Sequence, residues 1–245
     1  MCEGLALFAQ AAEGADMIII DGSEGEGGGQ VVRNACALSL VTGTPVQITN
    51  VRAKRSKPGL MRQHVTALQS ACAIGNAECE GLAVSSSEVT FRPGRVVPGE
   101  YRFAVGTAGS TGLVLQTILM PLVLADAPSR LVLEGGTHNM LAPPFEFIDK
   151  VFLPIINRMG PVVEARLVRH GFYPRGGGRI EVDITPAPLL PIECVDRDSR
   201  DRCKRNDSQL SGAAPQDGLC GTWRHELLDL IACRGCEPLG VRPLS

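Results

Sequence analysis

Short apolar runs and stretches with helical spacing of apolar residues follow one another along the chain in a regular order. The first run, Met17 to Asp21, is continuous and β-branched and ends in glycines, which predicts a buried strand. A glycine-rich turn follows, and then a segment with apolar residues at helical spacing that stops at Gly43. The first unit therefore predicts strand, helix, strand, helix, strand and strand, over residues 17–21, 27–43, 45–49, 60–74, 77–82 and 88–91.

The same order of elements is predicted a second time. It covers residues 101–105, 113–124, 130–133, 144–159, 162–168 and 179–184. Both units place a glycine-rich loop between the first strand and the first helix. A repeat of about 80 residues predicts two similar modules packed side by side. We therefore expect an α/β (α+β sandwich-like) fold with two tandem βαβαββ modules, at 17–98 and 99–190.

The ends of the chain have a different pattern. Between 191 and 222 only four residues are Val, Ile or Leu, and charges occur in runs. Such a segment buries too little apolar surface to offset the entropy lost on ordering. We expect 191–245 to begin an inserted domain and to continue as a poorly folded, irregular tail, and 1–16 to be a disordered N-terminal extension.

Composition narrows the function classes only slightly. The net charge is −2, so nucleic-acid binding requires a local basic patch rather than a general positive field. No apolar run reaches the roughly 18 residues that span a bilayer, and the N-terminus lacks a basic signal-peptide region. These features predict a cytoplasmic protein without a membrane partner. Cys36 and Cys72 lie on apolar-periodic segments and are predicted to be small buried residues.

The first candidate site is the glycine-rich segment from Asp21 to Arg33. Glycines at a strand-to-helix junction let backbone N–H groups approach a phosphate at a helix N-terminus. The segment matches neither the P-loop nor the dinucleotide fingerprint. Glu26 beside a phosphate requires a divalent cation between them, and Arg33 could supply a fork for phosphate. A tight turn with solvated carboxylates is the alternative.

The second candidate site is a basic loop that leads into a helix. Residues 52–62 hold five cations, and Gln63 and His64 follow on the first helical turn. Such a local field suits a polyanion, although a solvated basic surface is the commoner explanation.

Two further segments carry polar groups in glycine-rich surroundings. In 106–116, Ser110 or Thr111 is predicted to cap a helix, and Gln116 is an amide on an otherwise apolar helix that needs partners. In 170–178, Pro174 and three glycines predict a hairpin between two strands.

Taken together, these segments resemble the RNA 3'-terminal phosphate cyclase family. The motifs that carry the resemblance are GSEGEGGGQVVR, RAKRSKPGLMRQH, RFAVGTAGSTGLVLQT, GGTHNMLAPPFEF and HGFYPRGGG, in family order. The resemblance covers about Met17 to Leu190. It implies a large domain of three repeated α/β modules, of which two are visible here, with a smaller domain inserted before the third.

The resemblance also implies a reaction and its participants. The family uses ATP and Mg²⁺ or Mn²⁺ to convert an RNA 3'-terminal phosphate to a 2',3'-cyclic phosphodiester, through enzyme–AMP and RNA–adenylate intermediates. The nucleophilic histidine belongs to the third module, so no histidine of this chain is assigned as catalytic. The residues that transfer position by position are Glu26 (metal and ATP), Gln116 (ATP), and, for the phosphate or RNA end, Arg33, Arg52, Arg55, Gln63 and His64.

The resemblance fades shortly after Arg197, where we hypothesise a reading-frame shift. Met17 is hypothesised to be the true start of the protein, since the family begins close to this strand. On this reading, the chain as written is expected not to become adenylylated. A non-catalytic RNA-binding relative or a pseudogene product is the alternative. An enolpyruvyl transferase shares the repeat architecture but is not expected to carry HGFYPRGGG.

Overall fold

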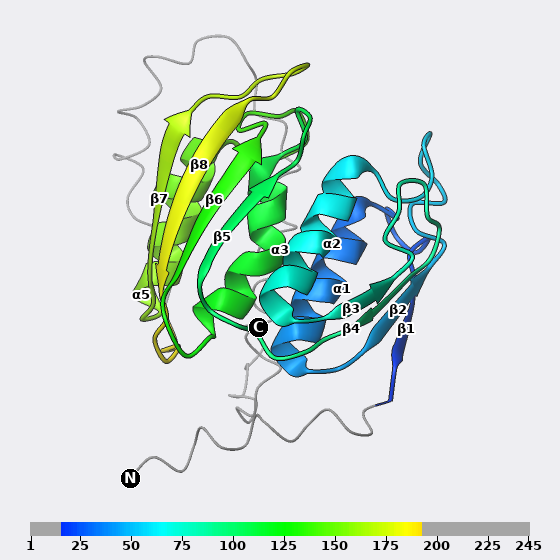
Figure 1. The fold of residues 1–245 in the computed structure, drawn as a ribbon, viewed down its shortest axis with the longest axis horizontal. Helices are drawn as coiled ribbons and strands as arrows, with labels where there is room; N and C mark the ends of the chain where they lie inside the picture. The colour runs from blue at the N-terminus through cyan, green and yellow to red at the C-terminus, as the bar shows by residue number, and fades with distance from the viewer. Residues whose placement is uncertain (1–15, 193–245) are drawn as a thin grey trace, which may run out of the picture. The chain divides into compact units, whose positions relative to one another are not determined.

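The computed structural model describes residues 16–192, which form two four-stranded sheets with helices against one face of each sheet (Figure 1). The predictions for 1–15 and 193–245 lie outside these described residues. Among residues 16–192, no helix is both long and apolar enough to cross a bilayer.

The first sheet has the strand order β1-β2-β4-β3. β1 and β2 pair in parallel, with α1 as their crossover, and β4 pairs antiparallel with both β2 and β3. α1 ends because Gly43 takes a left-handed conformation, and α2 ends in the same way at Asn76 rather than at the glycine before it. The elements are β1 Ile18–Asp21, α1 Gly29–Thr42, β2 Val46–Thr49, α2 Arg62–Gly75, β3 Glu78–Glu80 and β4 Val89–Arg92.

The second sheet repeats this topology in the order β5-β6-β8-β7. β5 pairs in parallel with β6, as β1 does with β2, so the two first strands occupy equivalent places. The predicted α/β fold class with its repeated βαβαββ module is therefore confirmed. The elements are β5 Glu100–Ala104, α3 Thr111–Val123, β6 Ser129–Gly135, α4 Phe145–Phe147, η2 Ile148–Phe152, α5 Leu153–Arg158, β7 Val162–Arg169 and β8 Gly178–Thr185.

The prediction that the first strand is buried is wrong. Ile18 and Ile19 are 53% and 70% exposed, and only Ile20 of the apolar residues in β1 is partly buried. Among the strands that the structure describes, β1 is at the edge of the sheet with one neighbour, whereas β2 lies inside the sheet and fully buries Ile48. A continuous apolar run therefore predicted a strand correctly but not its place in the sheet.

The helix predicted over 144–159 is present in three parts. α4 passes into η2, a π-helical turn, and α5 follows with Pro154 in its first turn. Proline has no N–H to donate to the carbonyl four residues earlier, so a regular α-helix cannot continue through this position unchanged. A widened π turn is one of the ways in which a helix accommodates such a break.

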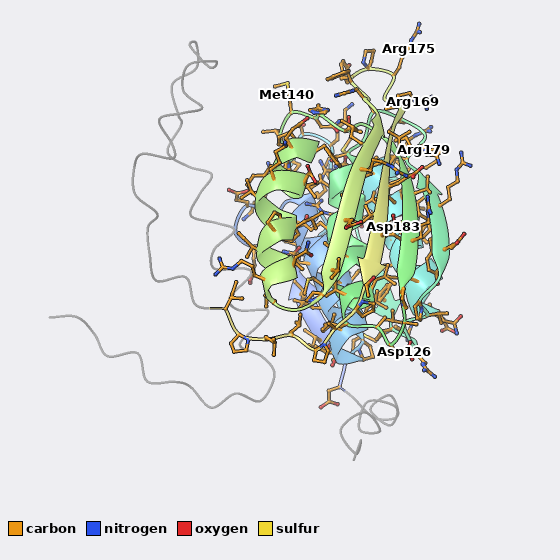
Figure 2. The ribbon with its side chains drawn as sticks, turned by 90° about the vertical axis from the view of Figure 1, so that its left-hand side faces the viewer. Asp126, Met140, Arg169, Arg175, Arg179 and Asp183 are labelled. Carbon is orange, nitrogen blue, oxygen red and sulfur yellow. The ribbon has the colours of Figure 1, made fainter. Side chains whose placement is uncertain are left out.

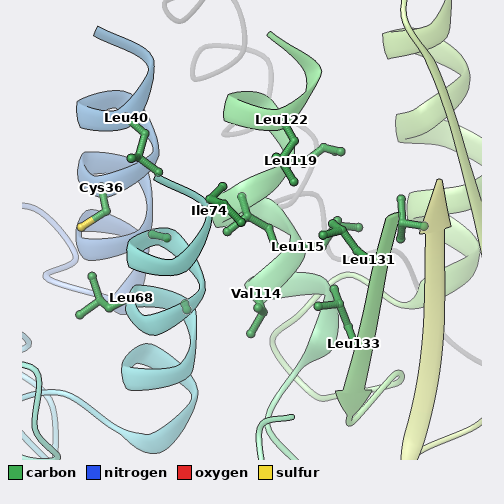
Figure 3. Close-up of a cluster of buried hydrophobic side chains, with 14 of the residues drawn as sticks. Cys36, Leu40, Leu68, Ile74, Val114, Leu115, Leu119, Leu122, Leu131 and Leu133 are labelled. Atoms are coloured by element: carbon green, nitrogen blue, oxygen red, sulfur yellow. The ribbon is translucent and has the colours of Figure 1, made fainter. Parts of the chain in front are cut away.

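The hydrophobic core is built mainly from aliphatic side chains on the helices and the central strands. α3 contacts both α1 and α2, so the helical faces of the two modules share one core (Figure 3). Cys36 is fully buried in it, as predicted, and burial raises the pKa of its thiol; Cys72 is only partly buried. Labelled members of the cluster are Leu40, Leu68, Ile74, Val114, Leu115, Leu119, Leu122, Leu131 and Leu133.

We expect the two isoleucines of the first sheet to respond differently to the loss of one methylene group. Ile48→Val should lower the free energy of unfolding by about 1 kcal/mol, because a buried methylene is replaced by a partial cavity. Ile19→Val should change it by less than about 0.5 kcal/mol, because this side chain is mostly exposed. Urea unfolding of both variants checks this, and equal losses would contradict the burial described above.

Candidate functional site

The first glycine-rich segment forms a turn between the end of β1 and the start of α1. The carboxylate of Asp21 accepts hydrogen bonds from the backbone N–H of Ser23 at 2.9 Å and from the side chain of Asn50 at 3.2 Å. The backbone N–H of Gly22 donates to the carbonyl of Thr49 at 2.8 Å. These bonds fix the turn to the end of β2. The basic loop follows directly after this strand.

His64, on the first turn of α2, packs against the first residue of α1. A Cβ atom on Gly29 would lie 2.1 Å from Nε2 of His64 and within 2.9 Å of two ring carbons. The imidazole is 3% exposed. Its Nδ1 accepts the backbone N–H of Met61 at 3.0 Å, which fixes the ring. Only glycine fits at position 29 while the imidazole stays in this place.

The surroundings of His64 also fix its charge and its tautomer. Burial, and then the nearby cations Arg33 and Arg52, lower the pKa of the imidazole from 6.5 to about 4. The ring is therefore neutral at pH 7. Because Nδ1 accepts a hydrogen bond, the proton of the neutral ring is on Nε2. His64 thus presents a neutral N–H donor toward the N-terminus of α1.

This lowered pKa predicts a loss of stability on mild acidification. The unfolded chain takes up a proton at His64 near pH 6.5 and the folded protein only near pH 4, so stability falls as the pH drops through this window. Between pH 7 and pH 5 the contribution is about 2 kcal/mol. Urea unfolding of the wild type and His64→Gln at both pH values measures it. An equal pH dependence in the two proteins would contradict the lowered pKa.

The basic loop contributes one arginine to the glycine turn. Nη2 of Arg55 lies 3.8 Å from Oε2 of Glu26, and both side chains are substantially exposed. The same Nη2 lies 3.2 Å from the position that a Cβ atom on Gly28 would take. The guanidinium of Arg55 therefore lies next to the backbone that leads into α1.

Arg52 contributes to the shape of the basic loop. Its Nη1 donates to the carbonyls of Lys57 and Gly59, at 2.6 Å and 2.7 Å, and closes the loop on itself. Its backbone is in the left-handed region, with a φ of 54°. A contact of this residue with phosphate stays a prediction, while its structural role is visible directly.

Two further predicted residues join the modules. Nε of Arg33, which is 8% exposed on α1, donates to Oε1 of Gln116 on α3 at 3.3 Å. Gln63 reaches the second glycine loop, where its Cβ and Oε1 lie 3.0 Å and 3.4 Å from a Cβ placed on Gly109. The side-chain amide of Gln116, on the apolar helix α3, therefore has the hydrogen-bond partner that its partial burial requires.

The structure confirms the structural roles predicted for two other segments. Ser110 caps α3, with its hydroxyl accepting the N–H of Leu113 at 3.4 Å. The segment 170–177 connects β7 and β8 as the predicted hairpin. Sequence reasoning missed the contact between Gly29 and His64 and the bond between Arg33 and Gln116, because neither pair is close in sequence.

The arrangement has the properties of an anion-binding face. The Arg55 guanidinium and the neutral imidazole N–H of His64 lie at the N-terminal end of α1, where backbone N–H groups add partial positive charge. Glu26, 78% exposed, is a carboxylate that could hold a hard cation there. The fold and this face together define a duplicated α/β protein with a candidate phosphate-binding site between its modules.

Comparison with known proteins assigns the family. Residues 24–206 match the family model described as RNA 3'-terminal phosphate cyclase, and the chain belongs to this family. It is similar to the RNA 3'-terminal phosphate cyclase of Koribacter versatilis (strain Ellin345), with 54% identity over 76% of this chain and 52% of the relative. The protein of that name from Ectopseudomonas mendocina (strain ymp) is 51% identical over 72% of this chain and 51% of its own length.

A third relative gives the same result. The RNA 3'-terminal phosphate cyclase of Ralstonia nicotianae is 52% identical over 70% of this chain and 50% of the relative. The chain thus spans about half the length of these curated relatives. The family match ends at residue 206, beyond the Leu190 at which the resemblance in sequence motifs was placed.

Proposed function

We propose that the face around Gly29 and His64 binds ATP and the 3'-phosphate end of RNA, in the ATP-dependent formation of a 2',3'-cyclic phosphodiester. The observation that carries this proposal is the contact between His64 and Gly29, beside the bond between Arg33 and Gln116. Residues that the family resemblance assigns to nucleotide and RNA-end binding come from both modules and meet at one place. Family membership supports the same activity.

Each residue has a role that follows from its chemistry. The Nε2–H of His64 donates to an oxygen of the RNA end, and it does so as a neutral group at physiological pH. Arg55 supplies a charged fork at the glycine turn, and Arg33 supplies positive charge from the protein interior. Gln116 orients Arg33 and, in the proposal, contacts the nucleotide.

Glu26 is the residue that would hold Mg²⁺ or Mn²⁺. Its carboxylate is exposed beside the glycine turn, and Mg²⁺ is commonly bound by one or two carboxylates together with substrate phosphates and water. The donor therefore fits a hard divalent ion. Such an ion, when bound, neutralises charge on the phosphates of ATP. Arg55, with Nη2 3.8 Å from Oε2 of Glu26, partly balances the negative charge of this carboxylate.

The proposal predicts that Arg55 recognises the phosphate at the RNA end. Arg55→Ala should weaken binding of a 3'-phosphorylated oligonucleotide about tenfold, because a charge-assisted hydrogen bond contributes about 1.5 kcal/mol or more. Binding of the same oligonucleotide with a 3'-hydroxyl should change little. Fluorescence anisotropy with both labelled RNAs measures the difference.

The matched control is Arg95→Ala. Arg95 is 83% exposed and pairs with Asp126 at 2.9 Å, outside the site, so its loss changes the net charge equally. It should leave both affinities within about twofold. A loss that is the same for both RNA ends in Arg55→Ala would show general attraction to RNA and would contradict recognition of the terminal phosphate.

A further inference from the structure

Two histidines and a glutamate form a cluster that shares no residue with the site above. His138 and Glu146 belong to the segment between β6 and η2, and His170 directly follows β7. One ligand atom of each residue lies within 4.8 Å of those of the other two. Nε2 of His138 is 2.8 Å and 3.1 Å from the two carboxylate oxygens of Glu146. The two imidazole rings stack, with centroids 5.3 Å apart.

Backbone hydrogen bonds hold the two histidine segments together. The backbone N–H groups of Thr137 and His138 both donate to the carbonyl of Gly171, at 2.9 Å and 3.4 Å. The N–H of Gly171 donates in return to the hydroxyl of Thr137 at 2.9 Å. A Cβ atom on Gly171 would lie 2.2 Å from the carbonyl oxygen of Gly135, so the chain passes here without room for a side chain. The closeness of His138 and His170 is thus built into the fold.

The chain segments that carry the cluster lie at one end of the second sheet. Figure 2 shows Met140, close in sequence to His138, and Arg169, which precedes His170, at the same end of the β-sheet. Phe172 stacks on both imidazoles, with centroids 5.4 Å and 6.0 Å from those of His138 and His170. The rings therefore cover one another, while the side chain of Glu146 is 51% exposed.

A buried polar group orients the first imidazole. Nδ1 of His138 lies 2.8 Å from the hydroxyl oxygen of Thr137, which is 4% exposed. Histidines that bind metals usually have such a partner on the second ring nitrogen, since it fixes the tautomer and the direction of the ring. Nε2 then faces the carboxylate of Glu146. Nε2 of His138 and a carboxylate oxygen of Glu146 thus face each other, and a ring nitrogen of His170 lies near both.

We propose that His138, Glu146 and His170 bind a first-row divalent metal ion of the Zn²⁺ type. Two imidazoles and one carboxylate are a ligand set that zinc accepts, with a coordination position left open. With bonds of about 2.0–2.1 Å, ligand atoms around tetrahedral zinc lie about 3.3 Å apart. The ligand atoms here lie within 4.8 Å of one another, so the widest pair must close by up to about 1.5 Å. The side chains of Glu146 and His170 are exposed, which leaves room for them to adjust, and the stacking of His170 on His138 keeps the two imidazoles adjacent.

Other properties of the cluster agree with this assignment. The Glu146 carboxylate faces Nε2 of His138 and is half exposed, so its oxygens are accessible to a cation. The open position would admit water or a phosphate oxygen. This site is separate from the Mg²⁺ or Mn²⁺ ligand Glu26, and its test does not depend on cyclase activity.

The test is residue-resolved NMR of the histidine ring protons in the full 245-residue chain. After treatment with a chelator, ZnCl₂ is titrated, and resonances are assigned with His138→Gln and His170→Gln. We expect the signals of His138 and His170 to shift together with one midpoint, while the buried His64 is unchanged. Glu146→Gln should raise the midpoint about tenfold or more, whereas Glu164→Gln, an exposed glutamate of β7, should leave it unchanged.

The histidine ring signals distinguish zinc binding at this site from zinc binding by any of the nine cysteines of the chain. Zinc uptake without a response of both rings overturns the proposal, as does a response of the two rings at different zinc concentrations. An equal midpoint in Glu146→Gln and Glu164→Gln overturns the role of the carboxylate. Circular dichroism of the variants confirms that the fold is retained.

Discussion

Replacing Gly29 with alanine is expected to lower the affinity for an RNA 3'-phosphate end on the order of 100-fold, the equivalent of two charge-assisted hydrogen bonds of about 1.5 kcal/mol each. The new methyl group would lie 2.1 Å from Nε2 of His64, so the imidazole or α1 must move. The ring cannot move freely, because it is 3% exposed and accepts the N–H of Met61. Its displacement takes the Nε2–H donor away from the N-terminus of α1 and disturbs the turn that carries Glu26.

The same substitution should also destabilise the fold. Forcing an extra carbon into a packed contact costs about 1–3 kcal/mol, and the higher helix propensity of alanine offsets part of this. Gly99→Ala is the matched control, since its nearest neighbour, a ring carbon of Tyr101, would be at 3.8 Å. Anisotropy and urea unfolding of both variants give the two quantities, and Gly99→Ala should change neither.

A double-mutant cycle separates the clash with His64 from any general effect of alanine at position 29. In a His64→Ala background the ring is absent, so Gly29→Ala should cost little further affinity or stability. The two substitutions should therefore be strongly non-additive, as expected for residues in contact. Additive losses would show that the imidazole is not what excludes a side chain from position 29.

The order of elements could be predicted from the sequence because it depends on local signals. Apolar spacing distinguished the helices from the strands, and glycine-rich turns recurred at the same point in both modules. The place of a strand within its sheet depends on which strands pair, and pairing joins residues far apart in the chain. Ile19 lies in a continuous apolar run and is exposed because β1 is at the edge of the described sheet, whereas Ile48 lies in the alternating strand β2 inside the sheet and is buried.

The candidate site was predictable in its residue types but not in its contacts. Glycine loops and a basic run indicate an anion-binding site, and this inference does not require knowledge of which residues are in contact. The lowered pKa of His64 depends on burial and on Arg33, which lies on another helix, so no pattern in the sequence contains it. The cluster of His138 and His170 had no recognisable spacing, because a backbone contact between loops creates it.

Gln116→Glu should weaken ATP binding about 30-fold while leaving the protein at least as stable as the wild type. The new carboxylate would replace an amide of the same shape and accept the same hydrogen bond from Nε of Arg33. A charge-assisted bond is stronger than a neutral one, so stability is retained or raised. The guanidinium charge is then neutralised, and the carboxylate repels a nearby phosphate by about 2 kcal/mol at the effective dielectric constant of a protein surface.

Two comparisons make this result specific to the bond between the modules. Gln69→Glu adds the same charge at an exposed position on α2 and should change ATP affinity by less than about twofold. Gln116→Ala removes the acceptor without adding charge, so it should lower both stability and ATP affinity by about 1 kcal/mol, because Arg33 loses a buried partner. Isothermal titration calorimetry with ATP and urea unfolding distinguish the variants. If Gln116→Glu binds ATP as tightly as the wild type, the nucleotide does not lie near Arg33 and Gln116, and the face between the modules is not its site.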